Sequence, residues 1–302
     1  MSLIARSRLK AKPIFTLSVR SRPAKRSSPT PFTPQSRTMA SSEPATKRQK
    51  SGKDVPYELI YWPGLPGRGE HIRLLLEAAG ASYTDSGHLK NGMSVVTSQI
   101  SPSNLGDSSN PPPLAPPILK HGDLTISQTP NIVFYLGKRH GLMGEEHDDG
   151  AEWKINALVL TALDGLSNEP HDTHHPVATG LYYEDQKPEA KRKAEDYIKN
   201  RLPKFLGYFE RVLSGEASKG GEWLYGGRLT VADLVLWQCL DGVRYAFPNA
   251  TKRLEKEGQY SKVFEHQGRV KELPKIKAYL GSERRQKYGM GIYRHYPELD
   301  EE

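Results

Sequence analysis

A change of pattern near residue 144 constrains the fold of this chain more than any other feature of its sequence. Before it, stretches rich in β-forming residues are interleaved with segments of helical periodicity; after it, the periodic segments are all helical. A switch from α/β to all-α patterning marks a domain boundary. We therefore predict an extension at 1–55, an α/β domain at 56–143 and an all-helical domain at 144–302.

The α/β domain has the pattern of a four-stranded sheet with helices on its faces, in a thioredoxin-like order. The predicted elements are a strand at 57–62, a helix at 68–79, a strand at 81–88, a short helix at 93–100, a hairpin at 117–126 and a helix at 129–140. The helical domain is predicted to hold helices at 151–166, 188–213, 231–245, 261–271 and 275–284. The fold class is therefore α+β.

The first 55 residues hold the positive charge of the chain. They contain 13 Lys or Arg and two acids, a net charge of +11, whereas the whole chain carries +8 and the rest therefore −3. A folded part without a basic excess gives no electrostatic reason to expect nucleic-acid binding. No apolar stretch reaches the roughly 18 residues of a membrane-spanning helix, so no membrane span is expected.

The extension resembles an organellar transit peptide, because it is rich in Ser, Pro, Arg and Lys and residues 1–42 lack acids. Such a segment is too polar to bury a core of its own. Import and cleavage would give a mitochondrial protein, whereas initiation at Met39 would omit residues 1–38 and leave a cytoplasmic one. Both localisations stay open at this point.

Four motifs follow one another along the folded part. They are Tyr61-Trp62 with Gly67-Arg68-Gly69-Glu70, the hairpin that begins at Pro117, Ser127-Gln128-Thr129, and Thr230 with Asp233 three residues later. Together they resemble the glutathione transferase family, nearest to its tyrosine-type sigma, mu and pi classes. The resemblance covers most of residues 56–297 and implies a glutathione-binding α/β domain followed by an all-helical domain.

Tyr61 is the residue to which the resemblance assigns catalysis. In the family, the tyrosine that ends the first strand donates a hydrogen bond to the glutathione sulfur. A thiol with a pKa of about 8.5 is only slightly ionised at neutral pH, so a phenol donor raises the thiolate population. The N-terminal amides of the helix at 68–79 favour the same negative charge. Arg68 falls at a family position that supports this site.

Pro117 falls at the family's cis-proline before the third strand. The preceding residue normally uses its backbone N–H and C=O to bind the cysteinyl part of glutathione. Here that residue is Pro116, which has no N–H, so one of the two hydrogen bonds must be missing or made differently. The loop at 63–66 is also one residue longer than its sigma-class counterpart.

Gln128 and Thr129 match the Gln/Glu-Ser pair that holds the γ-glutamyl carboxylate in the family. A hydroxyl and free amides at a helix N-terminus form an anion site, and Thr129 is also expected to cap the helix. Asp164 matches an aspartate that reaches the γ-glutamyl amine of glutathione bound to the other subunit. The resemblance therefore implies a homodimer with shared sites; otherwise Asp164 is an ordinary surface acid.

His174, His175 and Tyr182 are candidates for the second-substrate site. The segment 171–175 holds three histidines and an aspartate, and in the family this region borders the electrophile pocket. Its spacing matches no zinc motif, so no metal is expected.

Two features of the helical domain are interpreted as structural. Thr230 and Asp233 form a capping box, which is a folding signal and not part of the site. Cys239 is the one cysteine of the chain, so an intramolecular disulfide is excluded and a core position is expected.

The resemblance implies a transferase that adds the glutathione thiolate to hydrophobic electrophiles, a detoxification reaction of glutathione metabolism. Two alternatives stay open. One is a non-catalytic binding or regulatory protein on the same fold, which Pro116 favours; the other is a glutathione-dependent peroxidase or isomerase with the same thiolate site. His88, Lys90 and Lys120 are candidates for holding the glycine carboxylate.

Overall fold

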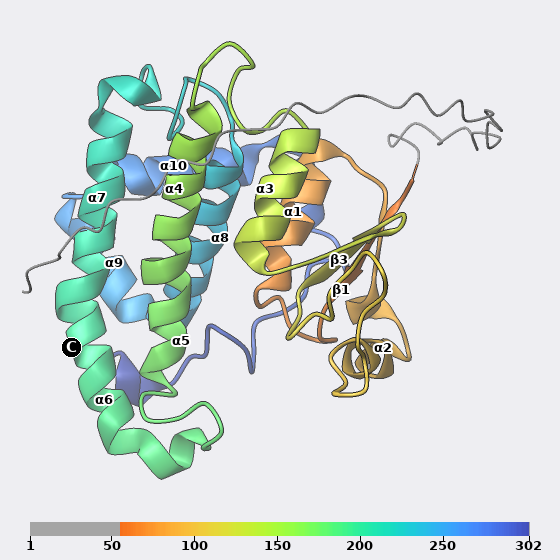
Figure 1. Ribbon diagram of the computed structural model, residues 1–302. Helices are drawn as coiled ribbons and strands as arrows, with labels where there is room; N and C mark the ends of the chain where they lie inside the picture. Colours follow the sequence, from red (N-terminus) through yellow and green to blue (C-terminus); the bar gives the residue numbers. More distant parts are fainter. Residues whose placement is uncertain (1–54, 302) are drawn as a thin grey trace, which may run out of the picture. The chain divides into compact units, whose positions relative to one another are not determined.

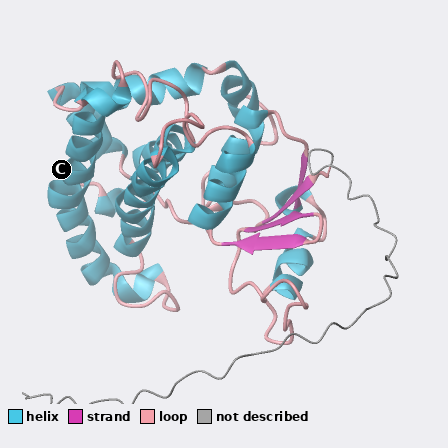
Figure 2. Cartoon of the chain, turned by 45° about the horizontal axis from the view of Figure 1, so that its top comes forward, coloured by secondary structure: helices cyan, strands magenta, loops and turns pink. Residues whose placement is uncertain are grey.

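The structure, a computed structural model, describes residues 55–301. The predicted extension, and with it the targeting prediction, lies outside the described residues apart from residue 55. A mixed sheet of four strands in the order β2-β1-β3-β4 begins the fold (Figure 2). β1 (Tyr57–Ile60) pairs in parallel with β2 (Tyr83–Asp85) and antiparallel with β3 (Ile118–His121), which pairs antiparallel with β4 (Leu124–Ser127).

Helices cover both faces of this sheet (Figure 1). α1 (Gly69–Ala79) and α3 (Thr129–Arg139) contribute to the main hydrophobic core on one face. α2 (Gly92–Gln99) lies on the other face, where Val96 packs in a smaller core with Ile60. Because successive strand residues face opposite sides of a sheet, neighbouring residues of β1 enter different cores.

Glycines end two of these elements. Gly80 takes a φ of 70° and caps α1, and Gly122 takes a φ of 62° in the turn between β3 and β4. A left-handed backbone at these places would cost a residue with a Cβ about 1 kcal/mol. The peptide bond between Pro116 and Pro117 is cis, as the resemblance implied.

The second part of the fold is helical in all its described elements. Their bounds are α4 (Ala151–Leu163), α5 (Glu169–Thr173), α6 (Lys187–Asp196), α7 (Leu202–Ser214), α8 (Val231–Ala246), α9 (Pro248–Glu257), α10 (Ser261–Glu272) and α11 (Pro274–Leu280). α8 is buried along most of its length. The predicted capping box is confirmed at its N-terminus, where the Asp233 carboxylate accepts from the Thr230 N–H at 2.7 Å. The α+β fold class is therefore confirmed.

The helical part differs from the prediction in three details. A π-helical segment at Asp164–Asn168 continues α4 into α5, and another at Tyr197–Arg201 joins α6 to α7. The predicted helices at 151–166 and 188–213 thus each contain wider turns. The prediction missed α9, although Pro248 at its start and Gly258 after its end are the usual boundary residues of a helix.

A buried ion network joins α1 to the segment that follows α11. Glu70 has a fully buried side chain that pairs with Arg73 at 3.1 Å and also with Arg285. The Tyr279 hydroxyl donates to Glu70 at 2.8 Å, and Arg73 in turn pairs with Asp85 at 2.6 Å. Buried charges of this kind are tolerated only when they are paired, so the network ties the sheet part to the helical part.

The predicted core position of Cys239 on α8 is confirmed. Its side chain is 0% exposed, and burial raises the pKa of the thiol to about 12. The thiol is therefore protonated and out of reach of solvent.

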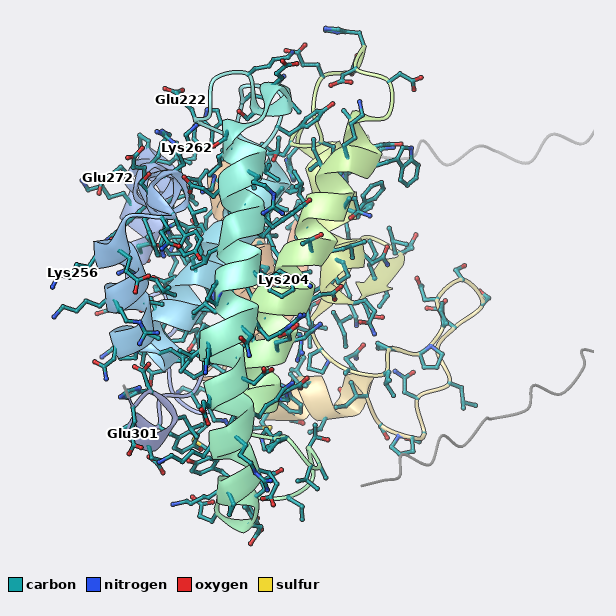
Figure 3. All side chains as sticks on the ribbon, turned by 90° about the vertical axis from the view of Figure 1, so that its left-hand side faces the viewer. Lys204, Glu222, Lys256, Lys262, Glu272 and Glu301 are labelled. Atoms are coloured by element: carbon teal, nitrogen blue, oxygen red, sulfur yellow. The ribbon has the colours of Figure 1, made fainter. Side chains whose placement is uncertain are left out.

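The outer surface of the helical part is charged. Lys204 on α7, Lys256 on α9 and Glu272 on α10 are among its exposed side chains (Figure 3). Of the helices within residues 55–301, none has the length and apolar character needed to cross a membrane.

Candidate functional site

Tyr61 follows β1 and is held at both ends. Its backbone N–H donates to the Ser86 hydroxyl, which donates back to the Tyr61 carbonyl, each at 2.9 Å. Its phenol oxygen accepts from the backbone N–H of Arg68 at 2.8 Å. A Cβ on Gly67 would lie 2.2 Å from this oxygen, and one on Gly69 would lie 2.6 Å from Cγ of the ring. The loop therefore needs glycine at both places to pass over Tyr61.

The environment of Tyr61 keeps its phenol protonated. The side chain is 6% exposed, and burial raises its pKa, although the N–H of Arg68 partly opposes this effect. No acceptor within residues 55–301 takes the hydrogen of the phenol. The hydroxyl can therefore donate to an anion placed at the N-terminus of α1, where the helix dipole also favours negative charge.

A cavity of about 310 Å³ lies beside Arg68. Its walls bring together the six residues that the resemblance assigns to glutathione binding. Tyr61 does not line the cavity but is hydrogen-bonded to Arg68, which does. The lining includes Arg68, Pro116, Pro117, Gln128, Thr129, Asp164, Asn168, Leu160 and Leu163.

Gln128 and Thr129 show two features that point to a ligand. Gln128 has a φ of 72°, a region that non-glycine residues enter at a cost of about 1–3 kcal/mol. Thr129 is 4% exposed, and its hydroxyl has no hydrogen-bond partner among the described residues. The prediction that Thr129 caps α3 is wrong, because Gln128 occupies the N-cap position and Thr129 is the first residue of the helix. Its hydroxyl therefore lies at the start of α3 without a hydrogen-bond partner among the described residues.

Asp164 and Asn168 line the cavity from the helical part of the fold. Both are exposed, and both belong to the π-helical segment that follows α4. The Asn168 side-chain oxygen accepts from the Arg68 guanidinium at 3.0 Å. The sequence prediction missed Asn168, although its spacing of four from Asp164 places it on the same side of a helix. Wider helical turns of this kind are frequent at functional sites.

The cavity does not account for the glycine end of glutathione. His88, Lys90 and Lys120 are absent from its lining, in which Arg68 is the cationic residue. The imidazole of His88 instead makes a hydrogen bond of 3.1 Å with the carbonyl oxygen of Arg284. A carboxylate in this cavity therefore has Arg68 as its charged partner.

Of the three histidines at 171–175, His171 is the one whose pKa the charge of Arg68 lowers. Its ring centroid lies 5.1 Å from that of His174 and 5.2 Å from that of His175. Burial lowers the pKa of His171, and the positive charge of Arg68 lowers it further. His171 does not line the cavity beside Arg68.

The structure corrects the prediction for His174. Its side chain is 1% exposed, and its Nε2 lies 2.9 Å from the carbonyl oxygen of Ile292, so it contributes to the core. Tyr182 is 79% exposed, and neither it nor His175 lines the cavity beside Arg68. Within residues 55–301, no group of three His, Cys, Asp or Glu side chains is arranged to hold a metal ion.

Comparison with known proteins finds relatives of one family. Residues 171–283 match a family model described as "Glutathione S-transferase, C-terminal domain". The glutathione S-transferase of Plasmodium falciparum is 26% identical over 234 residues, which are 76% of this chain and 98% of that protein. Glutathione S-transferase P 1 of Xenopus laevis is 27% identical over 232 residues, covering 76% of this chain and 94% of the relative.

Solved structures share the fold. The pi-class glutathione S-transferase of Onchocerca volvulus superimposes with a TM-score of 0.56 at 23% identity and covers 75% of this chain and 92% of its own. The glutathione S-transferase of Ascaris lumbricoides gives a TM-score of 0.55 at 22% identity, with 77% and 98% covered.

Proposed function

Because the chain belongs to the glutathione S-transferase family, we propose that it binds glutathione beside Arg68 and transfers the sulfur to a hydrophobic electrophile. The thiolate is held against Tyr61 during the transfer. The protein is thus an enzyme of electrophile detoxification. Since one fold serves many functions, the proposal rests on the site residues and not on the fold alone.

The observation that carries the proposal is the cavity in which Thr129 presents an unpartnered hydroxyl beside the strained Gln128. A buried hydroxyl without a partner costs about 1–3 kcal/mol, and an acceptor on a ligand removes this cost. The γ-glutamyl end of glutathione supplies a carboxylate for the start of α3 and an ammonium group for Asp164. One cavity therefore offers a partner to each charge of that group.

The proposed reaction uses Tyr61 as a hydrogen-bond donor. The glutathione thiol loses its proton to water, and the thiolate accepts the hydrogen of the Tyr61 phenol, whose oxygen is held by Arg68. The thiolate then attacks an electrophilic carbon, and the leaving group or the adjacent π bond takes the electron pair. The contribution of Tyr61 is a larger thiolate population at neutral pH.

The proposed active form is a homodimer in which a second copy covers the outer face of α4. Trp153 and Leu160 on this helix are 63% and 41% exposed, and Trp153 stacks on Phe134 of α3 with ring centroids 5.8 Å apart. Leu160 and Asp164 are four residues apart and lie on one side of the helix, so a partner on this face would border the cavity. An exposed apolar patch of this kind favours a protein contact.

One observation favours a non-catalytic binding protein as the alternative. Pro116 lines the cavity and has no N–H, so it can offer a ligand only its carbonyl oxygen. A weaker hold on the cysteinyl part of glutathione would reduce both affinity and turnover. A peroxidase or isomerase would use the same Tyr61 and differ only in the second substrate.

Calorimetry with glutathione and a rate assay with a chromogenic aryl halide test the proposal on the full chain. We expect millimolar or tighter binding, turnover at neutral pH, and a Tyr61→Phe variant that binds glutathione normally but turns over about 10- to 100-fold more slowly, because a hydrogen bond to the thiolate is lost. Binding without turnover would favour the non-catalytic alternative. Absence of glutathione binding would contradict the transferase proposal and would favour a non-catalytic protein whose site Pro116 has altered.

The localisation proposal is that residues 1–38 direct the protein to mitochondria, while initiation at Met39 gives a cytoplasmic form. Mass spectrometry of the N-terminus of protein from each compartment tests it. Mitochondrial protein that begins at Met1 would contradict cleavage.

A further inference from the structure

Arg73 on α1 has a guanidinium that makes more contacts than charge balance requires. Its side chain is 0% exposed, and it pairs with Glu70 at 3.1 Å and with Asp85 at 2.6 Å. A buried charge is tolerated when it is paired, and these two carboxylates pair it. The guanidinium nevertheless also donates to the backbone carbonyl of Pro66 at 3.1 Å and to that of Leu65 at 3.4 Å. These two hydrogen bonds fix the position of a loop.

The loop that Arg73 holds carries the backbone donor to the Tyr61 phenol. Pro66 lies two residues before Arg68, whose N–H donates to the phenol oxygen of Tyr61 at 2.8 Å. Gly67 lies between them with a φ of 46°, so the chain turns sharply there. Because the Pro66 carbonyl is held, the direction of the Arg68 N–H is held as well.

A second contact of Arg73 leads to the backbone of Tyr61. The Asp85 carboxylate accepts from two nitrogens of Arg73, at 2.6 and 3.4 Å, and from the N–H of Gly87 at 2.8 Å. Ser86 lies between Asp85 and Gly87, and its hydroxyl bonds both the N–H and the carbonyl oxygen of Tyr61. Arg73 therefore holds each of the two segments that hold Tyr61, one at the phenol and one at the backbone.

Arg73 also acts on Tyr61 through its charge. The guanidinium carbon lies 5.7 Å from the centroid of the Tyr61 ring. Burial raises the pKa of Tyr61, and the positive charge of Arg73 is among the effects that oppose this rise. A positive charge beside the ring favours the phenol as a donor to an anion.

We propose that Arg73 is a positioning residue for the transfer reaction, which sets the place and direction of the Tyr61 hydroxyl from which the glutathione thiolate accepts. The inference rests on the proposed function, because it concerns the thiolate held against Tyr61. Arg73 does not line the cavity beside Arg68, so it acts on glutathione through Tyr61 and not by contact. A misplacement of about 1 Å can cost about 100-fold in rate, so turnover depends on such a residue.

A lysine in place of Arg73 keeps the charge but not the geometry. The planar guanidinium spans Asp85 and the Pro66 carbonyl together, whereas an ammonium is a point charge on a flexible stem. Arg73→Lys should lower kcat/KM about tenfold at neutral pH, because the bound thiol then ionises at a higher pH, while glutathione affinity stays near the wild-type value. The two rates should converge at high pH. A role in stability alone would lower the rate equally at every pH.

The test measures kcat/KM against pH and, separately, the ultraviolet absorbance of the thiolate in the complex with glutathione. The same substitution is then made in the Tyr61→Phe background. If Arg73 acts through Tyr61, Arg73→Lys changes the pH profile very little once the phenol is gone. Equal losses in both backgrounds, or an unchanged profile in Arg73→Lys alone, would overturn the inference.

Arg285→Lys is the matched control. Arg285 pairs with the same Glu70, but its other ion pair is with Asp241 on α8. The substitution disturbs the buried network without touching the segments that hold Tyr61, so the pH profile should stay that of the wild type. A profile that moves as far as in Arg73→Lys would show that loss of the network, and not the position of Tyr61, causes the change.

Asp85→Asn tests the other end of the same contact if Arg73→Lys does not fold. It keeps the size of the side chain but weakens the hold of Arg73, and should move the pH profile in the same direction. A wild type that neither binds nor turns over glutathione would contradict the proposed function and the inference with it. A wild type that turns over through Tyr61, with a profile that neither substitution moves, would contradict this inference only.

Discussion

Glu70 and Arg285 form an ion pair between α1 and the segment after α11, with exposed side-chain fractions of 0% and 12%. Glu70→Gln should lower the free energy of unfolding by about 3–5 kcal/mol, because it leaves buried arginine charge without its partner. Urea unfolding measures this change. Glu272→Gln is the control: it removes a pair whose two side chains are 60% or more exposed, and should cost less than about 1 kcal/mol. Similar losses in both variants would mean that the buried pair contributes no more to the free energy of unfolding than the exposed pair does.

The unpartnered hydroxyl of Thr129 leads to a prediction about affinity. Thr129→Val keeps the shape of the side chain but removes the oxygen, which bonds no described residue. Glutathione affinity should fall about 10- to 100-fold while the free energy of unfolding rises by about 1–3 kcal/mol, because the ligand loses a hydrogen bond and the folded protein loses a buried polar atom without a partner. Calorimetry and thermal unfolding together check this. Thr97→Val, on the exposed face of α2, should change neither quantity in a comparable way.

The backbone conformation of Gln128 leads to a prediction about both the free energy of unfolding and glutathione affinity. Gln128→Gly and Gln128→Ala both remove the side chain, but only glycine adopts a φ of 72° without strain. The glycine variant should therefore be more stable than the alanine variant by about 1 kcal/mol, while both bind glutathione less tightly than the wild type. If the two unfold with the same free energy, the strain at this residue is absent.

His71 makes the stability of the protein depend on pH. It is 1% exposed on α1, neither ring nitrogen has a partner among the described residues, and burial lowers its pKa to about 3. In the unfolded chain its pKa is about 6.5. As the pH falls below 6.5, the unfolded state takes up a proton that the folded state does not, so the free energy of unfolding decreases until the pH nears 3.

A replacement of His71 should reduce this loss. Between pH 7 and pH 5 the wild type should lose about 2 kcal/mol more than His71→Phe, as measured by urea unfolding at both pH values. The control is His147→Phe, at a side chain that is 84% exposed, and it should retain the wild-type loss. A His71 variant with unchanged pH dependence would show that its imidazole is protonated in the folded state.

Trp153 gives a direct test of the homodimer. Trp153→Glu places a charge on the exposed face of α4, where the second copy is proposed to lie, and should shift the protein to the monomer in sedimentation experiments. Lys204→Glu on α7 is a charge change on another exposed surface and should leave the assembly intact. A wild-type protein that sediments as a monomer would end the dimer proposal.

The sequence predicted local elements well where a single residue determines the backbone. The helix predicted at 68–79 ends at Gly80, the hairpin predicted at 117–126 turns at Gly122, and the Thr230–Asp233 capping box forms at the start of α8. The pattern also predicted which residues gather beside Arg68, because the family motif supplied their positions. What it could not supply was Asn168, whose role depends on the arrangement of the Arg68 side chain.

The remaining misses have the same origin in tertiary structure. His174 and His171 are indistinguishable by composition, and only the fold places His174 against the carbonyl oxygen of Ile292. The Glu70–Arg285 pair joins distant parts of the chain and leaves no local signal. By contrast, α9 had a readable signal in Pro248 and Gly258, and its omission was a fault of the pattern reading.

The position of the single cysteine affects how the protein reacts with electrophiles. Cys239 is buried in α8 as a protonated thiol, so the chain offers electrophiles no cysteine thiolate of its own to alkylate. An enzyme that uses a diffusible thiol as its nucleophile, and whose own thiol is buried, is not alkylated at that thiol by its electrophilic substrates. Because Cys239 is buried, the proposed reaction would consume glutathione and not a cysteine of the protein.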